Sequence, residues 1–135
     1  MNTRPAGPGH PMPDGRSLRL TVALPPSLNV WMRWHRMVRA RHAQAVREEV
    51  YWLVRAAGWQ GPPMSKARVT YRFWFPDARR RDPDNALAGT KFFADGLVDA
   101  GVLIDDDFRH YVPILEYGGV DKRRPRVETI IREVG

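Results

Sequence analysis

Four short segments alternate apolar and polar residues, as expected of strands that bury one face against a core. In the first, Ser17 to Leu24, every second residue from Leu18 is leucine or valine, and a Pro-Pro-Ser sequence ends the pattern. The other three run from Ala67 to Phe75, from Tyr111 to Tyr117 and from Arg126 to Ile131. The sequence therefore predicts four strands.

Two other segments repeat apolar residues every three or four positions, which is the period of a helix. The first spans residues 43–57 and is followed by Gly58, a common helix stop. The second runs from Pro83 or Asn85 to Ala100, with Asp82 as its N-cap and Gly89 as a weak point inside it. The order β-α-β-α-β-β predicts an α+β fold: a single domain with helices packed on one mixed sheet.

Composition narrows the class of protein. The chain has 135 residues and no cysteine, which excludes a disulfide framework, a thiolate zinc site and a cysteine nucleophile. No apolar run approaches the roughly 20 residues that a membrane span needs. Residues 1–16 are rich in proline and glycine and lack the apolar stretch of a secretory signal. We expect a mobile tail over residues 1–16, a domain over residues 17–135, a cytoplasmic location and no membrane partner.

The positive net charge of +7 is unevenly distributed. Residues 82–107 hold seven aspartates and one lysine, a charge of −6, which leaves +13 for the rest of the chain. One interpretation of this acidic island is helix capping plus a solvated loop. The other is a site for a hard cation such as Mg²⁺, which prefers carboxylate oxygens, set among arginines that hold phosphate.

The spacing inside the island favours the cation site. Asp82 and Asp84 lie at a strand-to-helix junction, where two carboxylates can converge on one cation. Lys91 follows Asp84 by seven residues, so it falls on the same helix face about two turns further on. A short loop then returns to Asp105 and Asp106. A lysine beside a metal-bound phosphate can stabilise developing charge, and metal-bound water is a suitable nucleophile.

At these residues the sequence resembles the RusA family of Holliday junction resolvases. The resemblance covers roughly residues 18–133 and includes an N-terminal loop with Pro25-Pro26-Ser27 and Asn29. Its central signature is Phe75-Pro76-Asp77 and Arg79-Arg80-Arg81 running into Asp82-Pro83-Asp84-Asn85, completed by Lys91, Asp95, Leu97, Ala100-Gly101-Val102 and Asp105-Asp106.

The resemblance implies a homodimeric, Mg²⁺-dependent endodeoxyribonuclease that makes paired nicks in four-way DNA junctions, with Mn²⁺ as an alternative metal and no organic cofactor. Members of the family are often encoded by phages or prophages. Asp82, Asp84 and Asp106 match its catalytic, metal-binding aspartates, and Asp105 is an adjacent, secondary carboxylate. Lys91 matches its catalytic lysine, although the best-known form places that lysine four residues after the second aspartate. The longer spacing keeps the helix face and moves the lysine by about 4.5 Å.

Arginine is the expected DNA-binding residue. Arg81 matches a basic residue beside the family's metal site, and the first choices for phosphate contacts are Arg33, Arg36, Arg39 and Arg41, followed by Arg79 and Arg80. Trp31 and Trp34 fit either a core or interface position or stacking on bases. Asp95 is expected to pair with Lys91 at i+4, Asp107 to be solvated, and the histidines to be surface polar residues.

Two other functions stay open at this stage. The chain could be a non-catalytic, basic nucleic-acid-binding module of the same fold, in which the aspartates are structural. It could also be a related metal nuclease that acts on flaps or replication forks instead of four-way junctions.

Overall fold

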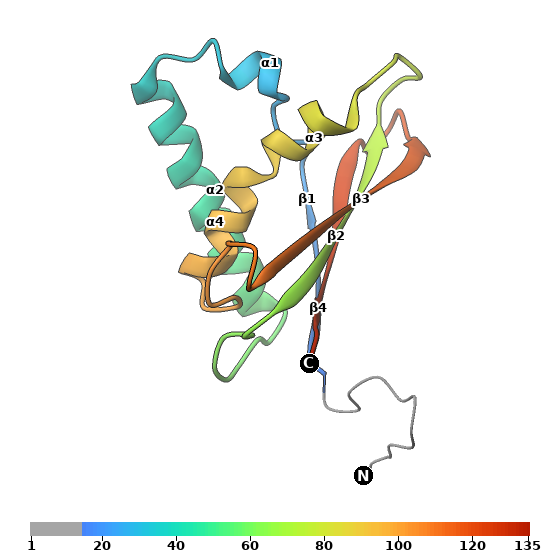
Figure 1. Ribbon diagram of the computed structural model, residues 1–135. Coiled ribbons are helices and arrows are strands. Elements are labelled where there is room, and N and C mark those ends of the chain that lie inside the picture. Colours follow the sequence, from blue (N-terminus) through green and yellow to red (C-terminus); the bar gives the residue numbers. More distant parts are fainter. Residues whose placement is uncertain (1–14) are drawn as a thin grey trace.

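A mixed four-stranded sheet forms the centre of the computed structural model, which describes residues 15–135. The strand order is β1-β4-β2-β3, with β2 and β3 parallel and the other two pairs antiparallel. The elements are β1 (Ser17–Val22), α1 (Leu28–Trp31), α2 (Arg36–Ala56), β2 (Ala67–Phe75), α3 (Pro83–Gly89), α4 (Lys91–Asp99), β3 (Tyr111–Val120) and β4 (Arg126–Glu133) (Figure 1). The predicted α+β class with a mixed sheet is confirmed. Most of the predicted tail over residues 1–16 lies outside the described residues.

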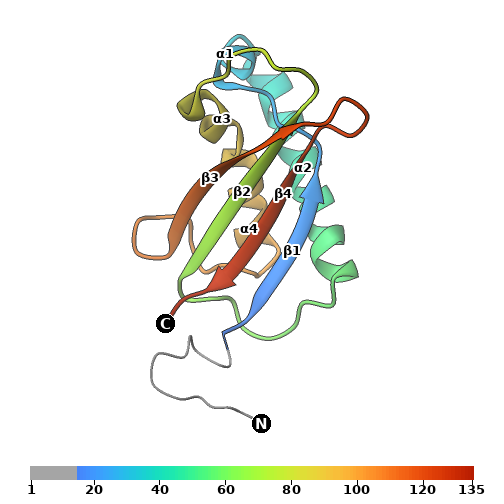
Figure 2. The same ribbon diagram turned by 90° about the vertical axis from the view of Figure 1, so that its right-hand side faces the viewer.

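The helices cover one face of the sheet and leave the other face open (Figures 1 and 2). The alternation along β2 explains this, because Val69, Tyr71 and Phe73 are buried while Arg68 is exposed. The core lies between this buried face and the apolar residues of α2 and α4, including Val50, Val54, Phe93 and Leu97.

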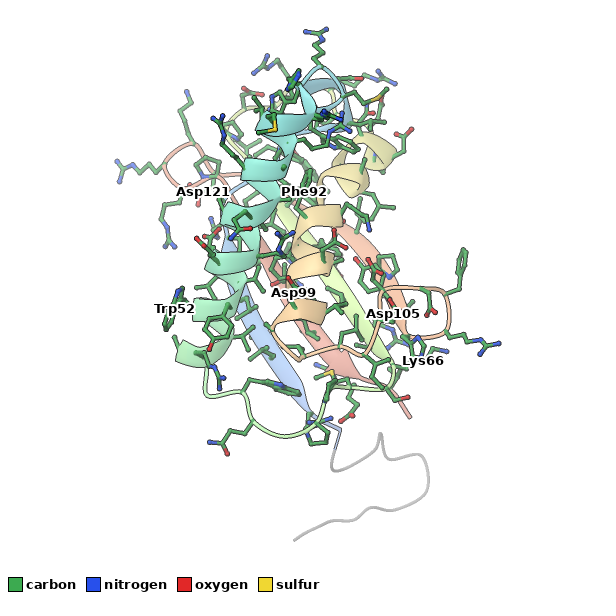
Figure 3. All side chains as sticks on the ribbon, turned by 90° about the vertical axis from the view of Figure 1, so that its left-hand side faces the viewer. Trp52, Lys66, Phe92, Asp99, Asp105 and Asp121 are labelled. Atoms are coloured by element: carbon green, nitrogen blue, oxygen red, sulfur yellow. The ribbon has the colours of Figure 1, made fainter. Side chains whose placement is uncertain are left out.

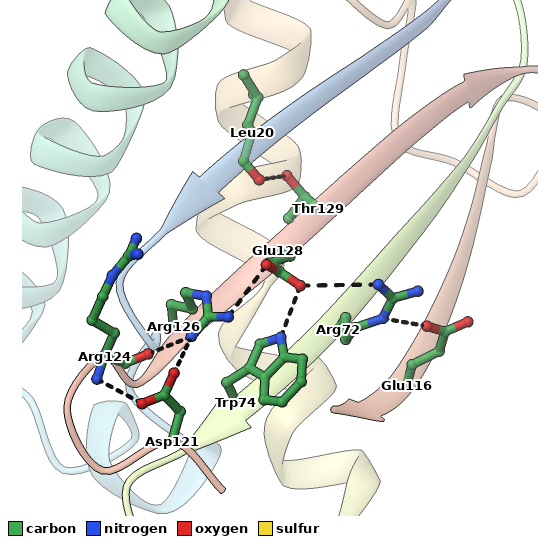
Figure 4. Close-up of polar contacts among 9 residues, drawn as sticks. All are labelled: Leu20, Arg72, Trp74, Glu116, Asp121, Arg124, Arg126, Glu128 and Thr129. Carbon is green, nitrogen blue, oxygen red and sulfur yellow. Dashed lines mark hydrogen bonds and ion pairs between the residues drawn. The ribbon is translucent and has the colours of Figure 1, made fainter. Parts of the chain in front are cut away.

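The open face of the sheet carries a network of charged side chains (Figure 4). Arg72 pairs with Glu116 on β3 at 2.9 Å, and the Trp74 indole donates to Glu128 on β4 at 2.8 Å. That hydrogen bond, together with the nearby Arg126, lowers the pKa of Glu128. The network crosses β3, β2 and β4, and it lets the sheet keep a polar, hydrated face.

Helix α2 begins at Arg36, seven residues before the predicted start at residue 43. The Nδ1 atom of His35 accepts a hydrogen bond from the Met37 amide at 3.1 Å, which caps the first turn. The aliphatic periodicity missed the start of this helix because its less exposed residues there, Arg39 and His42, are not aliphatic. The short helix α1 was not predicted either.

The second predicted helix is not continuous, and the prediction was wrong at Thr90. Two helices, α3 and α4, meet there, and the Thr90 hydroxyl donates to the Leu87 carbonyl at 2.6 Å. The loop after β1 packs against this point, since a Cβ atom at Gly89 would lie 2.3 Å from the Pro26 carbonyl oxygen. Only glycine tolerates so close a backbone approach.

His42 is half-buried, so the expectation of a surface polar residue was wrong for it. Its ring lies 4.9 Å from the Phe92 ring and 5.0 Å from the Trp34 ring, both edge-on. Phe92 in turn lies between α2 and α4 (Figure 3). The buried Nε2 atom of His42 has no hydrogen-bond partner within the described residues, and desolvation lowers the pKa of the imidazole.

We predict that Gly89→Ala destabilises the protein, although alanine normally strengthens a helix. The added methyl group would collide with the Pro26 carbonyl, and overpacking of this kind costs about 1–3 kcal/mol. Urea denaturation followed by circular dichroism measures the free energy of unfolding. An increase in stability, as helix propensity alone would give, would contradict the close approach.

We predict that the His42→Phe variant loses less stability than the wild type when the pH is lowered. The unfolded histidine takes up a proton near its ordinary pKa of 6.5, whereas the folded one does so only at lower pH. The unfolded state is therefore favoured as the pH falls below about 6.5. Denaturation curves at pH 7.5 and 5.5 should converge for the variant. Equal losses of the free energy of unfolding in the wild type and the variant would show that His42 does not contribute to the pH dependence.

Candidate functional site

Lys91 is the centre of the candidate site. It opens α4, and its ammonium lies 3.0 Å from Asp95 Oδ1 and 3.4 Å from Asp106 Oδ2. The predicted pairing of Lys91 with Asp95 is therefore confirmed. The hydrogen bond that Lys91 donates to Asp95, with the negative charge of both aspartates, raises the pKa of Lys91 and keeps it cationic.

A groove surrounds this lysine, and we call it the lysine groove. It is lined by Leu87, Ala88, Thr90, Lys91, Ala94, Asp106, Tyr111 and Pro113. Beneath it the hydroxyl oxygens of Tyr71 and Tyr111 lie 2.5 Å apart. Burial raises the pKa of both phenols, and the charge of Asp106 raises it further. Asp106 therefore lies near a hydroxyl pair that stays protonated at neutral pH.

Asp82 and Asp84 lie at the start of α3. Asp82 occupies the N-cap position, but its side chain makes no capping hydrogen bond and instead pairs with Arg80 at 3.0 Å. Asp84 is exposed in the first turn. Helix capping, the structural alternative for these carboxylates, thus does not account for Asp82.

The structure brings together some of the predicted acidic residues and separates others. Across residues 15–135, the one group of three potential ligand residues whose donor atoms all lie within 4.8 Å of one another is Asp105, Asp107 and His110. Asp82, Asp84 and Asp106 do not form such a group, because α3 starts at the other end of the crossover from the loop that carries Asp105 (Figures 1 and 3).

His110 was not singled out by the sequence. Its Nδ1 atom contacts the Asp107 carboxylate, which lowers the pKa of that carboxyl group. Asp107 is exposed, as predicted, but this contact shows that it also has a defined partner. The Asp-x-x-His spacing is the sequence feature that could have indicated this pair.

The donor chemistry of Asp82, Asp84 and Asp106 fits Mg²⁺. All three offer carboxylate oxygens, and Mg²⁺ usually takes one or two carboxylates and fills its remaining positions with water and substrate phosphate. Within the described residues these three side chains do not form the closed three-ligand arrangement that the sequence suggested.

Arg79, Arg80 and Arg81 line a second groove, which we call the arginine groove. It also contains Asp82 and Asn85, with Pro25, Ser27 and Asn29 from the loop after β1. Arg81 contacts the Asp77 carboxylate at 2.8 Å and lies over the Phe75 ring, 4.4 Å from its centroid. Arg79 also binds Asp77, and the two arginines hold the pKa of that carboxyl group well below its usual range.

The four arginines around the start of α2 differ in their freedom. Arg39 lies 5.0 Å from the centroid of the Trp31 ring and donates to the Trp31 carbonyl at 3.4 Å. Trp31 itself packs edge-on against Phe92. Within the described chain, the exposed side chains of Arg33, Arg36 and Arg41 form no hydrogen bond or ion pair. These three side chains are therefore free to contact an anion, whereas Arg39 packs on Trp31 and stabilises the turn before α2.

Comparison with known proteins identifies no family for this chain. No protein-family model matches it, and no curated protein matches it either. Within residues 15–135, no helix combines the length and the apolar character needed to cross a membrane. Any assignment of function therefore rests on the residues themselves.

Proposed function

We propose that this protein is a RusA-like, metal-dependent endodeoxyribonuclease that resolves four-way DNA junctions by paired, symmetric nicks. The observation that carries the proposal is the contact between Lys91 and Asp106, residues that are 15 positions apart. Their predicted catalytic roles require them to act at one place, and they share the lysine groove.

The arginine groove gives a second line of support. The loop residues Ser27 and Asn29 belong to one end of the family-like signature, and Arg79 to Asn85 belong to its centre. Asn29 and Arg79 are 50 positions apart in the sequence, yet both parts line this groove. Signature residues that together bind one substrate are expected to line one surface.

Each residue would contribute a distinct step. Asp82, Asp84 and Asp106 would hold Mg²⁺, with Asp105 as an adjacent carboxylate; the bound ion would lower the pKa of a water nucleophile and bind the scissile phosphate. Lys91 would neutralise charge that develops on that phosphate, and its raised pKa keeps it cationic for this role. The expected products are a 5′-phosphate and a 3′-hydroxyl.

Branched DNA is the proposed substrate and a second copy of the chain the proposed partner. Two equivalent nicks need two equivalent sites, which a two-fold homodimer supplies in register with the symmetry of the junction. Arg33, Arg36 and Arg41 would hold the phosphate backbone, with the segment Arg79 to Arg81 beside the cut. Phosphate contacts position DNA without reading its sequence, so branch shape should dominate recognition.

One observation favours the alternative of a non-catalytic DNA-binding module. The three aspartates do not converge within ligand distance in the described structure. If Mg²⁺ and DNA do not draw them together, the basic surface would bind junctions without cutting them. A nuclease for flaps or forks would differ only in its preferred substrate, so cutting of a flap is compared with cutting of the junction.

We predict that the protein nicks synthetic four-way junctions with Mg²⁺ and that EDTA stops it. Asp84→Asn should abolish nicking, because it removes a metal ligand. It should keep or strengthen junction binding, because one negative charge facing the phosphates is gone. Denaturing gels measure nicking and band-shift titrations measure binding. Four-way, flap and linear DNAs are compared in parallel.

Asp99→Asn is the matched control for this experiment. Asp99 belongs to the same acidic island but is exposed at the end of α4, where it pairs with Arg47 at 3.1 Å. Its variant should nick like the wild type. Tight junction binding without cutting, unaltered by Asp84→Asn, would support the non-catalytic alternative and refute the nuclease.

We predict that Arg36→Gln reduces the salt dependence of junction binding. Each phosphate contact contributes about −0.9 to the slope of log affinity against log salt concentration, so the loss of one contact should flatten the slope by about one. Arg55→Gln, at the far end of the same helix, should leave the slope unchanged. Equal slopes for all three proteins would exclude the start of α2 from the DNA interface.

A further inference from the structure

Phe108 is the most exposed of the large hydrophobic side chains in the described structure. Its relative exposure is 101%, against 68% for Trp52 and 69% for Tyr117. The other two rings have aromatic neighbours, since Trp52 packs on Tyr51 and Tyr117 stacks with Phe75. Within residues 15–135, Phe108 has no aromatic neighbour, so its ring contributes nothing to packing.

The turn that carries Phe108 is well defined. The Arg109 amide donates to Asp107 Oδ1 at 3.1 Å, and the His110 and Tyr111 amides donate to the Asp107 carbonyl at 3.1 and 3.0 Å. Together with the contact between the Asp107 and His110 side chains, these bonds fix the backbone on both sides of the ring. The phenylalanine is thus presented outward by an ordered turn.

Phe108 is close in the sequence to a residue that lines the lysine groove. Phe108 follows Asp106 by two residues, and Asp106 contacts Lys91 inside that groove. Arg109 adjoins the ring in the sequence, is exposed, and makes no side-chain hydrogen bond or ion pair within the described chain. An apolar ring and a cation at consecutive positions, two residues after a candidate metal ligand, match the flat face and the charged backbone of a nucleotide.

We propose that Phe108 stacks on a nucleobase that is unpaired or unstacked at the branch point of the DNA, while Arg109 contacts an adjoining phosphate. The inference rests on the proposed function and adds the residue that would recognise the branch. Duplex arms keep their bases stacked, whereas a branch point exposes base faces that an apolar ring can cover. Phe108 would therefore distinguish junctions from linear duplexes.

Because the Phe108 ring, within the described chain, has no apolar neighbours on its loop, a nucleobase suits it better as a binding partner than a second protein surface does. Protein interfaces use a continuous apolar patch in which a buried ring is surrounded by further contacts. On this loop, Ile104 is also exposed, at 51%, but three aspartates separate it from Phe108. Docking of a second copy of the chain on the loop is therefore the competing occupant that the experiment must detect.

The test uses junctions with 2-aminopurine at the branch point, in EDTA so that no cutting occurs. Binding of wild type should raise the 2-aminopurine fluorescence as the base leaves its stack. Phe108→Ala should lose most of this rise and bind the junction about 5- to 150-fold more weakly, with unchanged affinity for linear duplex. Phe108→Tyr keeps a ring and should behave like the wild type.

Controls separate the possible failures. Trp52→Ala removes another exposed ring, far along α2, and should change neither signal. Because Phe108 is fully exposed, its removal leaves no cavity, and circular dichroism should show an intact fold. Sedimentation of wild type and Phe108→Ala gives the oligomeric state.

Each outcome decides a specific point. Normal junction binding and fluorescence by Phe108→Ala, with wild type nicking normally, would overturn the stacking role and leave the proposed function standing. Conversion of a dimer to a monomer by Phe108→Ala, or failure of Phe108→Tyr to rescue, would also overturn it. If wild type neither binds nor cuts junctions, the proposed function fails and the inference fails with it.

Discussion

The parallel pairing of β2 with β3 is the constraint on which the rest of this structure depends. Ala67 at the start of β2 pairs with Tyr111 at the start of β3, so the chain leaves β2 at one end of the sheet and must return to the other. Parallel strands require such a crossover. Here α3 and α4, with 7 and 9 residues, cover about 24 Å at 1.5 Å per residue, close to the roughly 30 Å length of the nine-residue β2.

The crossover contains the whole acidic island, and it therefore sets the distances between the candidate catalytic groups. Asp82 and Asp84 lie where the crossover leaves β2, and Asp105 to Asp107 lie where it re-enters the sheet. Lys91 stands between them and contacts the second group. Within the described residues Asp82, Asp84 and Asp106 do not lie within ligand distance of one another, so a cation shared by all three needs these side chains to move closer together.

This explains which features could be predicted from the sequence. Strand β2 runs from Ala67 to Phe75 in the prediction and in the structure, because alternation reports directly on a buried sheet face. The Lys91–Asp95 pair was predictable because i and i+4 positions are neighbours on any helix. In contrast, the close approach of the Pro26 carbonyl to Gly89, next to the break at Thr90, joins segments far apart in the chain, and no local pattern encodes that contact. The separation of Asp82 from Asp106 likewise depends on a long-range strand pairing.

The structure shows which of the many arginines are paired with carboxylates and which can attract an anion. Several arginines are already occupied by protein carboxylates: Arg16 by Glu133, Arg72 by Glu116, Arg79 and Arg81 by Asp77, and Arg126 by Asp121. The formal charge of +13 outside the acidic island therefore overstates the charge that is free to attract an anion. Among the described arginines without a carboxylate partner are Arg33, Arg36 and Arg41, which lie around the start of α2 beside a turn that Trp31 and Arg39 hold in place. On the open face of the sheet, by contrast, Arg72 and Arg126 are neutralised by carboxylates, so these two arginines contribute little to the attraction of a polyanion.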